Sequence, residues 1–176
     1  MKTLRSFSEF VYEGTMTVPV AAASDFAAIL DKYDGEKEVG NNGGEMVEGF
    51  LKKLGLSKGL PWCQALVYAM FAEFAEKRGV PNPVPKTGAV LAHWKQAPEA
   101  AKIPVKDAIT DKTKVRPGQV FIKTRSGGGH DGIVLKVEGD SFISIDGNSS
   151  DKVKINKYKI QDMVGFIDYF QDPAFS

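Results

Sequence analysis

The pattern of apolar residues changes at Pro117, and this change constrains the fold more than any other feature of the sequence. Before Pro117, apolar side chains recur at helical spacing, whereas after it they form short β-type runs separated by turns that contain glycine. These runs cover residues 119–123, 131–137, 142–145 and 164–169. Helices followed by strands are typical of an α+β fold. We therefore predict N-terminal helices packed on a C-terminal antiparallel sheet.

The clearest expected helix starts at Pro61, which suits a first helical position, and ends before Gly79. Its apolar stripe consists of Leu66, Val67, Met70, Phe71 and Phe74. Three further helices are expected: a short one capped by Ser24, one over residues 46–54, and one capped by Thr87 and ended by Pro98. The main helix carries Cys63 in its first turn.

Length and charge limit the domain number and the class of partner. A chain of 176 residues with 43% hydrophobic content suits one domain, over residues 36–176, preceded by an N-terminal appendage over residues 1–35. Because 23 basic and 22 acidic residues are mixed along the chain, we expect neither a nucleic-acid partner nor membrane insertion. Glu9, Glu13 and Pro19 interrupt the N-terminal apolar residues, so no signal peptide is predicted.

Cys63 is the one cysteine of the chain, which excludes an intrachain disulfide. A thiolate is the nucleophilic form of cysteine, and the start of a helix lowers a thiol pKa because free backbone N–H groups favour the anion. Cys63 is therefore a candidate nucleophile. The alternative is that Cys63 is a small buried apolar residue beside Trp62.

A thiol nucleophile requires a base, and the chain contains two histidines. His93 lies within an apolar helical pattern with Val90 and Trp94, which favours a packed helix residue. His130 follows three glycines, 127–129, and opens a predicted strand, where Gly129 allows another element to approach closely. We predict His130 as the base; the alternative is an exposed loop histidine.

Asp146 and Asn148 are candidates to orient the imidazole of His130. The predicted strands over residues 131–137 and 142–145 form a hairpin. Their apolar residues share one face only if the numbers of each two paired residues have an even sum. This condition excludes a two-residue Gly139-Asp140 turn and favours a three-residue loop over 139–141. The same register places His130, Val134, Asp146 and Asn148 on the opposite face. The alternative is that Asp146-Gly147-Asn148 forms only a polar turn.

The remaining features of the site are less specific. The backbone N–H of Cys63 is a natural donor to a tetrahedral intermediate. Trp62 either lines the cleft, as a substrate-binding residue together with Gly129, or packs in the core. No histidine or cysteine spacing fits a metal site, and glycines 127–129 lack the lysine of a phosphate loop. We expect no metal and no cofactor.

Five segments of the sequence resemble the CHAP-like cysteine peptidases and amidases, papain-like hydrolases of phage and bacterial cell-wall lysis. The segments are Gly40-Asn41-Asn42, Gly59-Leu60-Pro61-Trp62-Cys63-Gln64-Ala65-Leu66-Val67, Pro117-Gly118-Gln119-Val120-Phe121-Ile122, Gly129-His130-Asp131-Gly132-Ile133-Val134 and Ile145-Asp146-Gly147-Asn148. The resemblance covers about residues 37–170 and implies a papain-like, CHAP-type fold. It implies Cys63 as nucleophile and His130 as base. Asp146 stands where such sequences usually have glutamate, so Asn148 is the alternative orienting residue.

The resemblance also implies the substrate, peptidoglycan. The bond cut is either that between muramic acid and L-alanine, as in an N-acetylmuramoyl-L-alanine amidase, or one within the stem peptide, as in an endopeptidase. Such a protein acts at the bacterial cell wall, phage-encoded as a lysin or delivered by another system, and residues 1–35 are candidates for docking on a phage or secretion-system assembly. Two alternatives stay open: an acyl transferase that uses the same Cys-His pair, and a non-catalytic binding or structural module of a phage particle.

Overall fold

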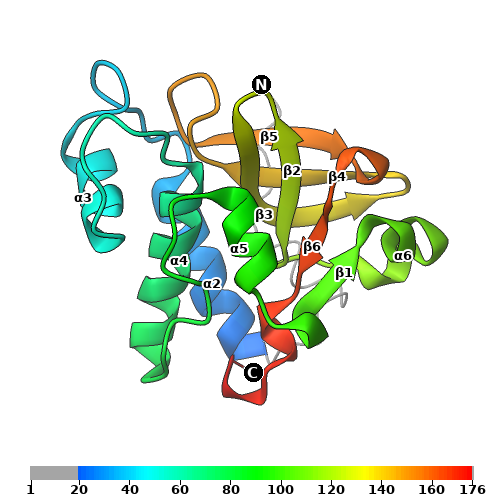
Figure 1. Cartoon of the computed structure of the whole chain (residues 1–176). Helices are drawn as coiled ribbons and strands as arrows, with labels where there is room; N and C mark the ends of the chain where they lie inside the picture. The colour runs from blue at the N-terminus through cyan, green and yellow to red at the C-terminus, as the bar shows by residue number, and fades with distance from the viewer. Residues whose placement is uncertain (1–19, 176) are drawn as a thin grey trace, which may run out of the picture.

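The computed structural model describes residues 20–175 and confirms the prediction of an α+β fold (Figure 1). The α-helices of this part of the chain are α2 (Val20–Tyr33), α3 (Glu45–Lys53), α4 (Cys63–Arg78), α5 (Val90–Gln96) and α6 (Val105–Thr110). The strands are β1 (Lys102–Pro104), β2 (Val120–Arg125), β3 (Gly128–Glu138), β4 (Ser141–Asp146), β5 (Lys154–Lys159) and β6 (Gly165–Ile167). Four of these strands correspond to the predicted runs, whereas β1, β5 and α6 were not predicted.

All six strands join one antiparallel sheet in the order β1-β6-β2-β3-β4-β5. Because side chains alternate along each strand, the sheet has two faces with different partners. On one face, apolar residues such as Val120, Ile133 and Ile145 pack in the same cluster as α2, α3 and α4. On the other face, a second cluster contains Phe121 and Phe142. The sheet therefore separates two hydrophobic clusters.

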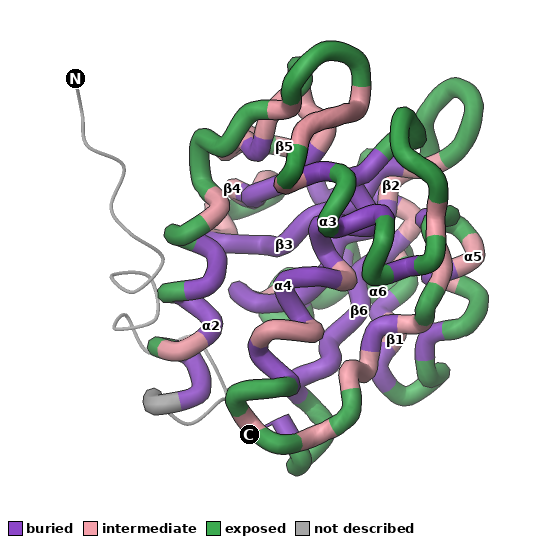
Figure 2. Tube along the Cα trace, turned by 90° about the vertical axis from the view of Figure 1, so that its left-hand side faces the viewer, coloured by how far each residue is buried: buried purple, intermediate pink, exposed green. Residues whose placement is uncertain are grey.

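Helix α4 lies at the centre of the larger cluster. It is buried along most of its length, and Figure 2 draws most of it in the buried colour with short intermediate stretches, because nearly every turn meets either the sheet or another helix. It ends at Gly79, whose φ of 66° is left-handed, as the glycine at that position predicted. Its start differs from the prediction: the first helical residue is Cys63, and Pro61 lies in the preceding loop. Cys63 is thereby fixed at the very start of the helix.

Helix α2 packs against α4 and the C-terminal segment. Phe26 is fully buried, and its ring lies 5.0 Å from that of Phe71 and 5.2 Å from that of Phe170. Residues 20–33 of the predicted appendage thus contribute to the main cluster, while residues 1–19 lie outside the described part of the chain. Ser24 lies inside α2, so the prediction that it caps a helix was wrong.

Thr87 also does not cap a helix. The residue before α5 is Ala89, and the hydroxyl of Thr87 instead accepts a hydrogen bond from the Ala89 N–H at 3.2 Å, within the loop. The helix itself ends at Gln96, two residues before Pro98, as expected.

The hairpin of β3 and β4 has the predicted facing but a different turn. Ile133 pairs with Ile145, so the sum of paired numbers is even there, as required by the apolar pattern. Near the turn, however, Glu138 pairs with Ser141, which leaves the two-residue turn that the sequence analysis excluded. A β-bulge between Val134 and Lys136 inserts one extra residue and reconciles the two registers.

No helix within residues 20–175 is long and apolar enough to cross a membrane.

Candidate active site

Cys63 lines a surface groove of about 850 Å³. The other walls come from the loop before α4, including Leu56 and Leu60, from the start of α5, and from the turn that joins β2 to β3. The Cys63 side chain is 6% exposed, so the sulfur is nearly covered but still adjoins the groove. A ligand in this groove would therefore meet the thiol at the start of α4.

The start of α4 meets β3 where that strand has no partner on one side. The β4 partners of β3 extend only from Glu138 back to Ile133, so residues 128–132 pair with β2 alone. The backbone N–H of Asp131, in this stretch, hydrogen-bonds the Cys63 sulfur. The thiol therefore contacts the strand one residue after His130.

Two glycines allow this close arrangement. A Cβ on Gly132 would lie 2.5 Å from the Cβ of Asp146, and a Cβ on Gly147 would lie 2.7 Å from the ring of Trp62. Both distances are too short for real atoms, so neither position accepts a side chain without a shift of its neighbours. Glycine at 132 lets Asp146 approach β3, and glycine at 147 lets the chain after β4 lie against the residue before Cys63.

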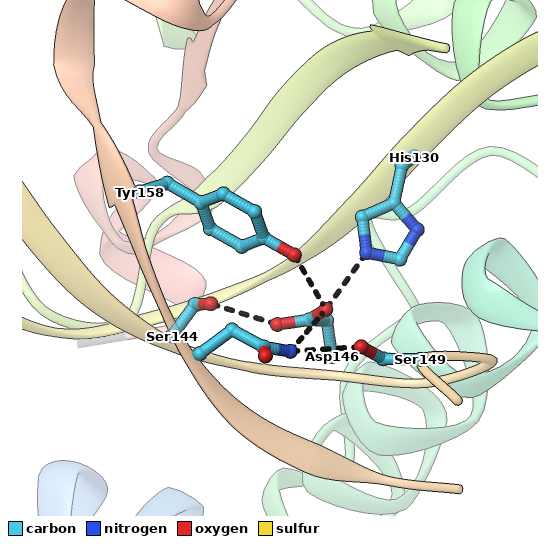
Figure 3. Close-up of polar contacts among 6 residues, drawn as sticks. His130, Ser144, Asp146, Ser149 and Tyr158 are labelled. Atoms are coloured by element: carbon cyan, nitrogen blue, oxygen red, sulfur yellow. Dashed lines mark hydrogen bonds and ion pairs between the residues drawn. The ribbon is translucent and has the colours of Figure 1, made fainter. Parts of the chain in front are cut away.

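His130 and Asp146 form a buried pair on the sheet face that points away from α4. Nε2 of His130 lies 2.7 Å from Oδ2 of Asp146. Figure 3 shows Asp146 surrounded by polar groups: Oδ2 also accepts from Tyr158 at 3.1 Å and from Asn156 at 3.0 Å, and Oδ1 accepts from Ser144 at 2.8 Å. Asp146, which is fully buried, is thus held in one orientation by side chains from β3, β4 and β5. The arrangement fixes the imidazole and favours a proton on Nε2.

The second nitrogen of the same imidazole has no partner among the described residues. Nδ1 of His130 is buried and makes no hydrogen bond, including none to the Cys63 sulfur. A buried ring nitrogen without a partner is uncommon because the lost hydrogen bond is costly. With Nε2 engaged by Asp146, Nδ1 is the nitrogen available to accept a proton from a neighbouring group.

The surroundings of Cys63 raise the pKa of its thiol, against the direction predicted from its place at a helix start. Burial is the largest cause, and the negative charge of Asp131 is the next. The backbone N–H groups of Gln64 and Asp131 hydrogen-bond the sulfur and act in the opposite direction, but they do not offset the burial. The thiol of the free protein is therefore neutral at physiological pH.

A second polar cluster, not predicted from the sequence, lies on the α4 side of the sheet. The carboxylate of the fully buried Asp131 faces the Cys63 thiol, and a hydrogen bond between the two side chains adds to the rise of the thiol pKa. Oδ2 of Asp131 is 3.7 Å from Nδ1 of His93. His93 is fully buried between Gln64 and Tyr169, whose side-chain oxygens lie 2.7 Å from Nδ1 and Nε2 respectively. His93 is a packed residue, as the spacing indicated, but its packing is polar and its carboxylate neighbour also acts on Cys63.

The sequence contained a signal for Asp131 but none for the residues that hold Asp146. Asp131 shares the alternation of Ile133 and Leu135, so an acidic residue stands where the pattern requires an apolar one. In contrast, Asn156 and Tyr158 lie on β5, and the run 154–159 alternates lysine with other residues too irregularly to indicate a strand. Of the four side chains that bond Asp146, His130 was predicted and Ser144 lies in a predicted run, whereas Asn156 and Tyr158 depend on a strand that the sequence did not predict.

The other predicted site residues occupy distinct places. Asn148 and Gly129 line the groove beside Cys63. Asn148 follows β4 with a φ of 54°, and it does not hydrogen-bond His130, whose Nε2 is engaged by Asp146. Trp62 is fully buried, donates from its indole N–H to Glu38 at 2.8 Å, and lies outside the groove lining. Within the described residues, the groove is thus bordered by Gly129 and Asn148 but not by Trp62.

Within residues 20–175, no group of three or more histidine, cysteine or acidic side chains is arranged to hold a metal ion. The sequence matches no protein-family model and no curated protein.

Proposed function

We propose that this protein is a peptidoglycan hydrolase that cleaves an amide bond, with Cys63 as nucleophile and His130 as general base, in a papain-like, CHAP-type domain. One observation carries the proposal. The imidazole of His130 is fixed through Nε2 by Asp146 while its Nδ1 has no partner, and the next residue along β3 hydrogen-bonds the Cys63 sulfur through its backbone N–H. A nucleophile, a base with one free nitrogen and an orienting carboxylate are the three parts that acyl transfer by a thiol requires.

The chemical steps follow from these parts. In the free protein His130 lies on the sheet face away from α4 and makes no hydrogen bond to Cys63, so the proposal requires substrate binding to bring the sulfur within reach of Nδ1. The thiol proton of Cys63 then passes to Nδ1 of His130 as the sulfur attacks the amide carbonyl carbon and forms a C–S bond. The C–N bond then breaks, and the imidazolium gives its proton to the departing amine. Water, deprotonated by the same nitrogen, attacks the thioester, which releases the carboxylic acid and restores the thiol. Asp146 stabilises the imidazolium in both steps and keeps the ring oriented.

The oxyanion of each tetrahedral intermediate requires hydrogen-bond donors. The backbone N–H of Cys63 is one donor, because it belongs to the first residue of α4 and has no partner within the helix. Stabilisation of this kind is usually worth a factor of about 100 or more in rate for each donor. The start of α4 therefore serves both the nucleophile and the developing negative charge.

The substrate class rests on the five motifs shared with CHAP-like enzymes, and the bond is either the muramoyl-alanine amide or an amide within the stem peptide. The open groove beside Cys63, about 850 Å³ in volume, has room for several residues of a peptide. Action at the bacterial cell wall follows from this substrate. A non-catalytic module with the same fold is the second candidate, because the Cys63 thiol is neutral and makes no hydrogen bond to His130.

The test is mass spectrometry of purified peptidoglycan from several wall types after incubation with the protein, with Cys63→Ala and with Lys58→Gln. Lys58 is exposed and lies outside the groove lining, so it controls for handling and folding. We expect soluble fragments from the unchanged protein and from Lys58→Gln, none from Cys63→Ala, and fragment masses that identify the bond. Products formed with and without a millimolar amino-acid acceptor distinguish hydrolysis from acyl transfer, since a hydrolase gives the free acid in both cases whereas a transferase gives mainly the new amide. Absence of Cys63-dependent fragments from every wall type, with retained binding to the wall, would favour the non-catalytic module.

A further inference from the structure

We infer that the groove beside Cys63 selects acyl donors that carry a free carboxylate, and that Arg125 binds this carboxylate. The inference deepens the proposed function, on which it rests, by naming the chemical class of peptide that the site accepts. It depends on the composition of the groove, on the position of Arg125 within it and on the absence of a carboxylate partner for Arg125 in the described part of the chain.

The groove is mainly apolar and glycine-rich, with one charge. Among the described residues that line it, Arg125 is the single charged side chain, and the other polar ones are Cys63, Thr87, Ser126 and Asn148. Leu60 and Leu91, which both line the groove, are 41% and 36% exposed and present apolar surface to a ligand. A ligand that fits this lining is apolar along most of its length and carries one negative group.

Arg125 is placed to meet such a group. It is the last residue of β2 and pairs with Gly128 across the hairpin turn, so its side chain begins at the rim of the groove. No carboxylate among residues 20–175 forms an ion pair with its guanidinium, whereas Lys32, Lys102 and Lys157 do have acidic partners. Its charge acts on the Tyr158 hydroxyl, whose pKa it lowers against the larger effect of burial. The charge of Arg125 is therefore available to a ligand.

The turn next to Arg125 leaves room for a ligand backbone. Gly127 and Gly128 have φ values of 83° and 154°, and a Cβ at either position would meet no atom within 4 Å. The following Gly129 is packed tightly, because a Cβ there would lie 2.7 Å from Val90. The hairpin is thus anchored at Gly129 and open beyond it, where a peptide can pass beside Arg125.

A carboxylate is the negative group that this arrangement favours. The planar guanidinium donates two parallel hydrogen bonds to a carboxylate, whereas a carboxamide presents one oxygen and no charge. The acidic residues near Cys63, Asp131 and Asp146, are fully buried and do not line the groove, so they do not compete for Arg125. Wall peptides that differ only in a free or an amidated carboxylate are therefore distinguished at this position.

The first test uses iodoacetate and iodoacetamide as probes, because they are of nearly equal size and displace iodide by the same thiolate attack but differ in charge. The ratio of their second-order rates with Cys63 is measured for the unchanged protein, Arg125→Gln, Arg125→Lys and Lys58→Gln. We expect Arg125→Gln to lower the iodoacetate-to-iodoacetamide ratio by about threefold, Arg125→Lys to retain part of it, and Lys58→Gln to leave it unchanged. The ratio cancels any change in thiol ionisation, and it does not require that the wall be the substrate.

A ratio unchanged in Arg125→Gln, or lowered equally by Lys58→Gln, would overturn the inference, since the effect would then be absent or due to overall charge. The second test compares peptidoglycan before and after its free carboxylates are converted to amides with carbodiimide and ammonium chloride. At substrate concentrations below KM, we expect the unchanged protein to release fragments about tenfold more slowly from the amidated wall, and Arg125→Gln to treat both walls alike. Loss of fragments from every wall together with an intact probe ratio would reject the proposed substrate but not the carboxylate site.

Discussion

Replacement of Asp131 by asparagine is expected to lower the pKa of the Cys63 thiol and to speed its alkylation near neutral pH. Asp131 is fully buried, and both its charge and its side-chain hydrogen bond with Cys63 raise the pKa of the thiol. Asparagine has almost the same shape but no charge. The substitution therefore removes one cause of the raised pKa while burial, the larger cause, persists.

The size of the expected pKa shift follows from a Coulomb estimate for two charges in contact. Two like charges in contact, about 4 Å apart, repel by about 4 kcal/mol at the effective dielectric constant of about 20 that suits protein sites. The polar groups around Asp131, including the imidazole of His93 at 3.7 Å, reduce this repulsion. We expect a net shift of about one to two pKa units, since each unit corresponds to about 1.4 kcal/mol.

The assay is the second-order rate of iodoacetamide alkylation between pH 6 and pH 10. The thiolate is the reactive form, so at a pH below both thiol pKa values Asp131→Asn is expected to react about 10 to 100 times faster than the unchanged protein. The matched control is Asp162→Asn, which removes an exposed carboxylate from the β5–β6 connection. If Asp131→Asn retains the alkylation profile of the unchanged protein while its circular dichroism shows a native fold, the assignment of the carboxylate charge as a cause of the raised pKa is refuted.

Three further predictions concern the base, the thiol and the packing. Asp146→Asn is expected to reduce wall hydrolysis at least about a hundredfold, measured as the rate of fragment release, because the imidazole loses its charged partner; a loss below tenfold would contradict its role. Because the folded thiol pKa is raised, the unfolded chain loses the Cys63 proton first; this stabilising contribution is complete below the unfolded pKa of about 8.5 and declines as pH rises above it. Between pH 7 and pH 9.5 the unchanged protein is expected to lose about 1.4 kcal/mol more of its free energy of unfolding than Cys63→Ala does, as measured by urea denaturation. Gly147→Ala is expected to destabilise the fold by about 1–3 kcal/mol, because the added methyl group clashes with the Trp62 indole. Its control is Gly49→Ala in α3, where open space surrounds the glycine and the change is expected to stabilise the fold by about 0.5–1 kcal/mol. Equal urea midpoints of the two variants would argue against tight packing at residue 147.

The sequence predicted those helices and strands whose apolar pattern is complete within the element and reflects packing against one layer of the fold. The helix that carries Cys63 has an apolar stripe and a terminal glycine, and the strands β2, β3 and β4 have clear alternation, so each was evident without knowledge of the rest of the chain. Strand β1 is three residues long, and β5 carries three lysines at the sheet edge. Their conformations are determined by pairing with other strands, which no local pattern expresses.

The candidate site was predictable to the same extent. Cys63, His130 and Asp146 were selected by residue type and by the facing of one hairpin, and the structure places His130 and Asp146 within hydrogen-bond distance. The predicted register put His130 and Asp146 on the correct face, but the predicted turn was wrong. The apolar pattern is intact on both sides of the bulge near Leu135, so the sequence does not show the bulge. The direction of the thiol pKa was wrong because burial and Asp131 act through contacts that the sequence does not show.

A neutral thiol determines how the proposed site works. If the thiol were ionised at rest, proton transfer to His130 would precede substrate binding and the imidazole would already be charged. With Cys63 neutral and Nδ1 of His130 unpartnered, the proton moves only as the sulfur attacks, and Asp146 stabilises the imidazolium as it forms. Binding of a substrate carbonyl at the start of α4 should favour the same proton transfer by excluding water from the groove, so the site is most reactive when occupied.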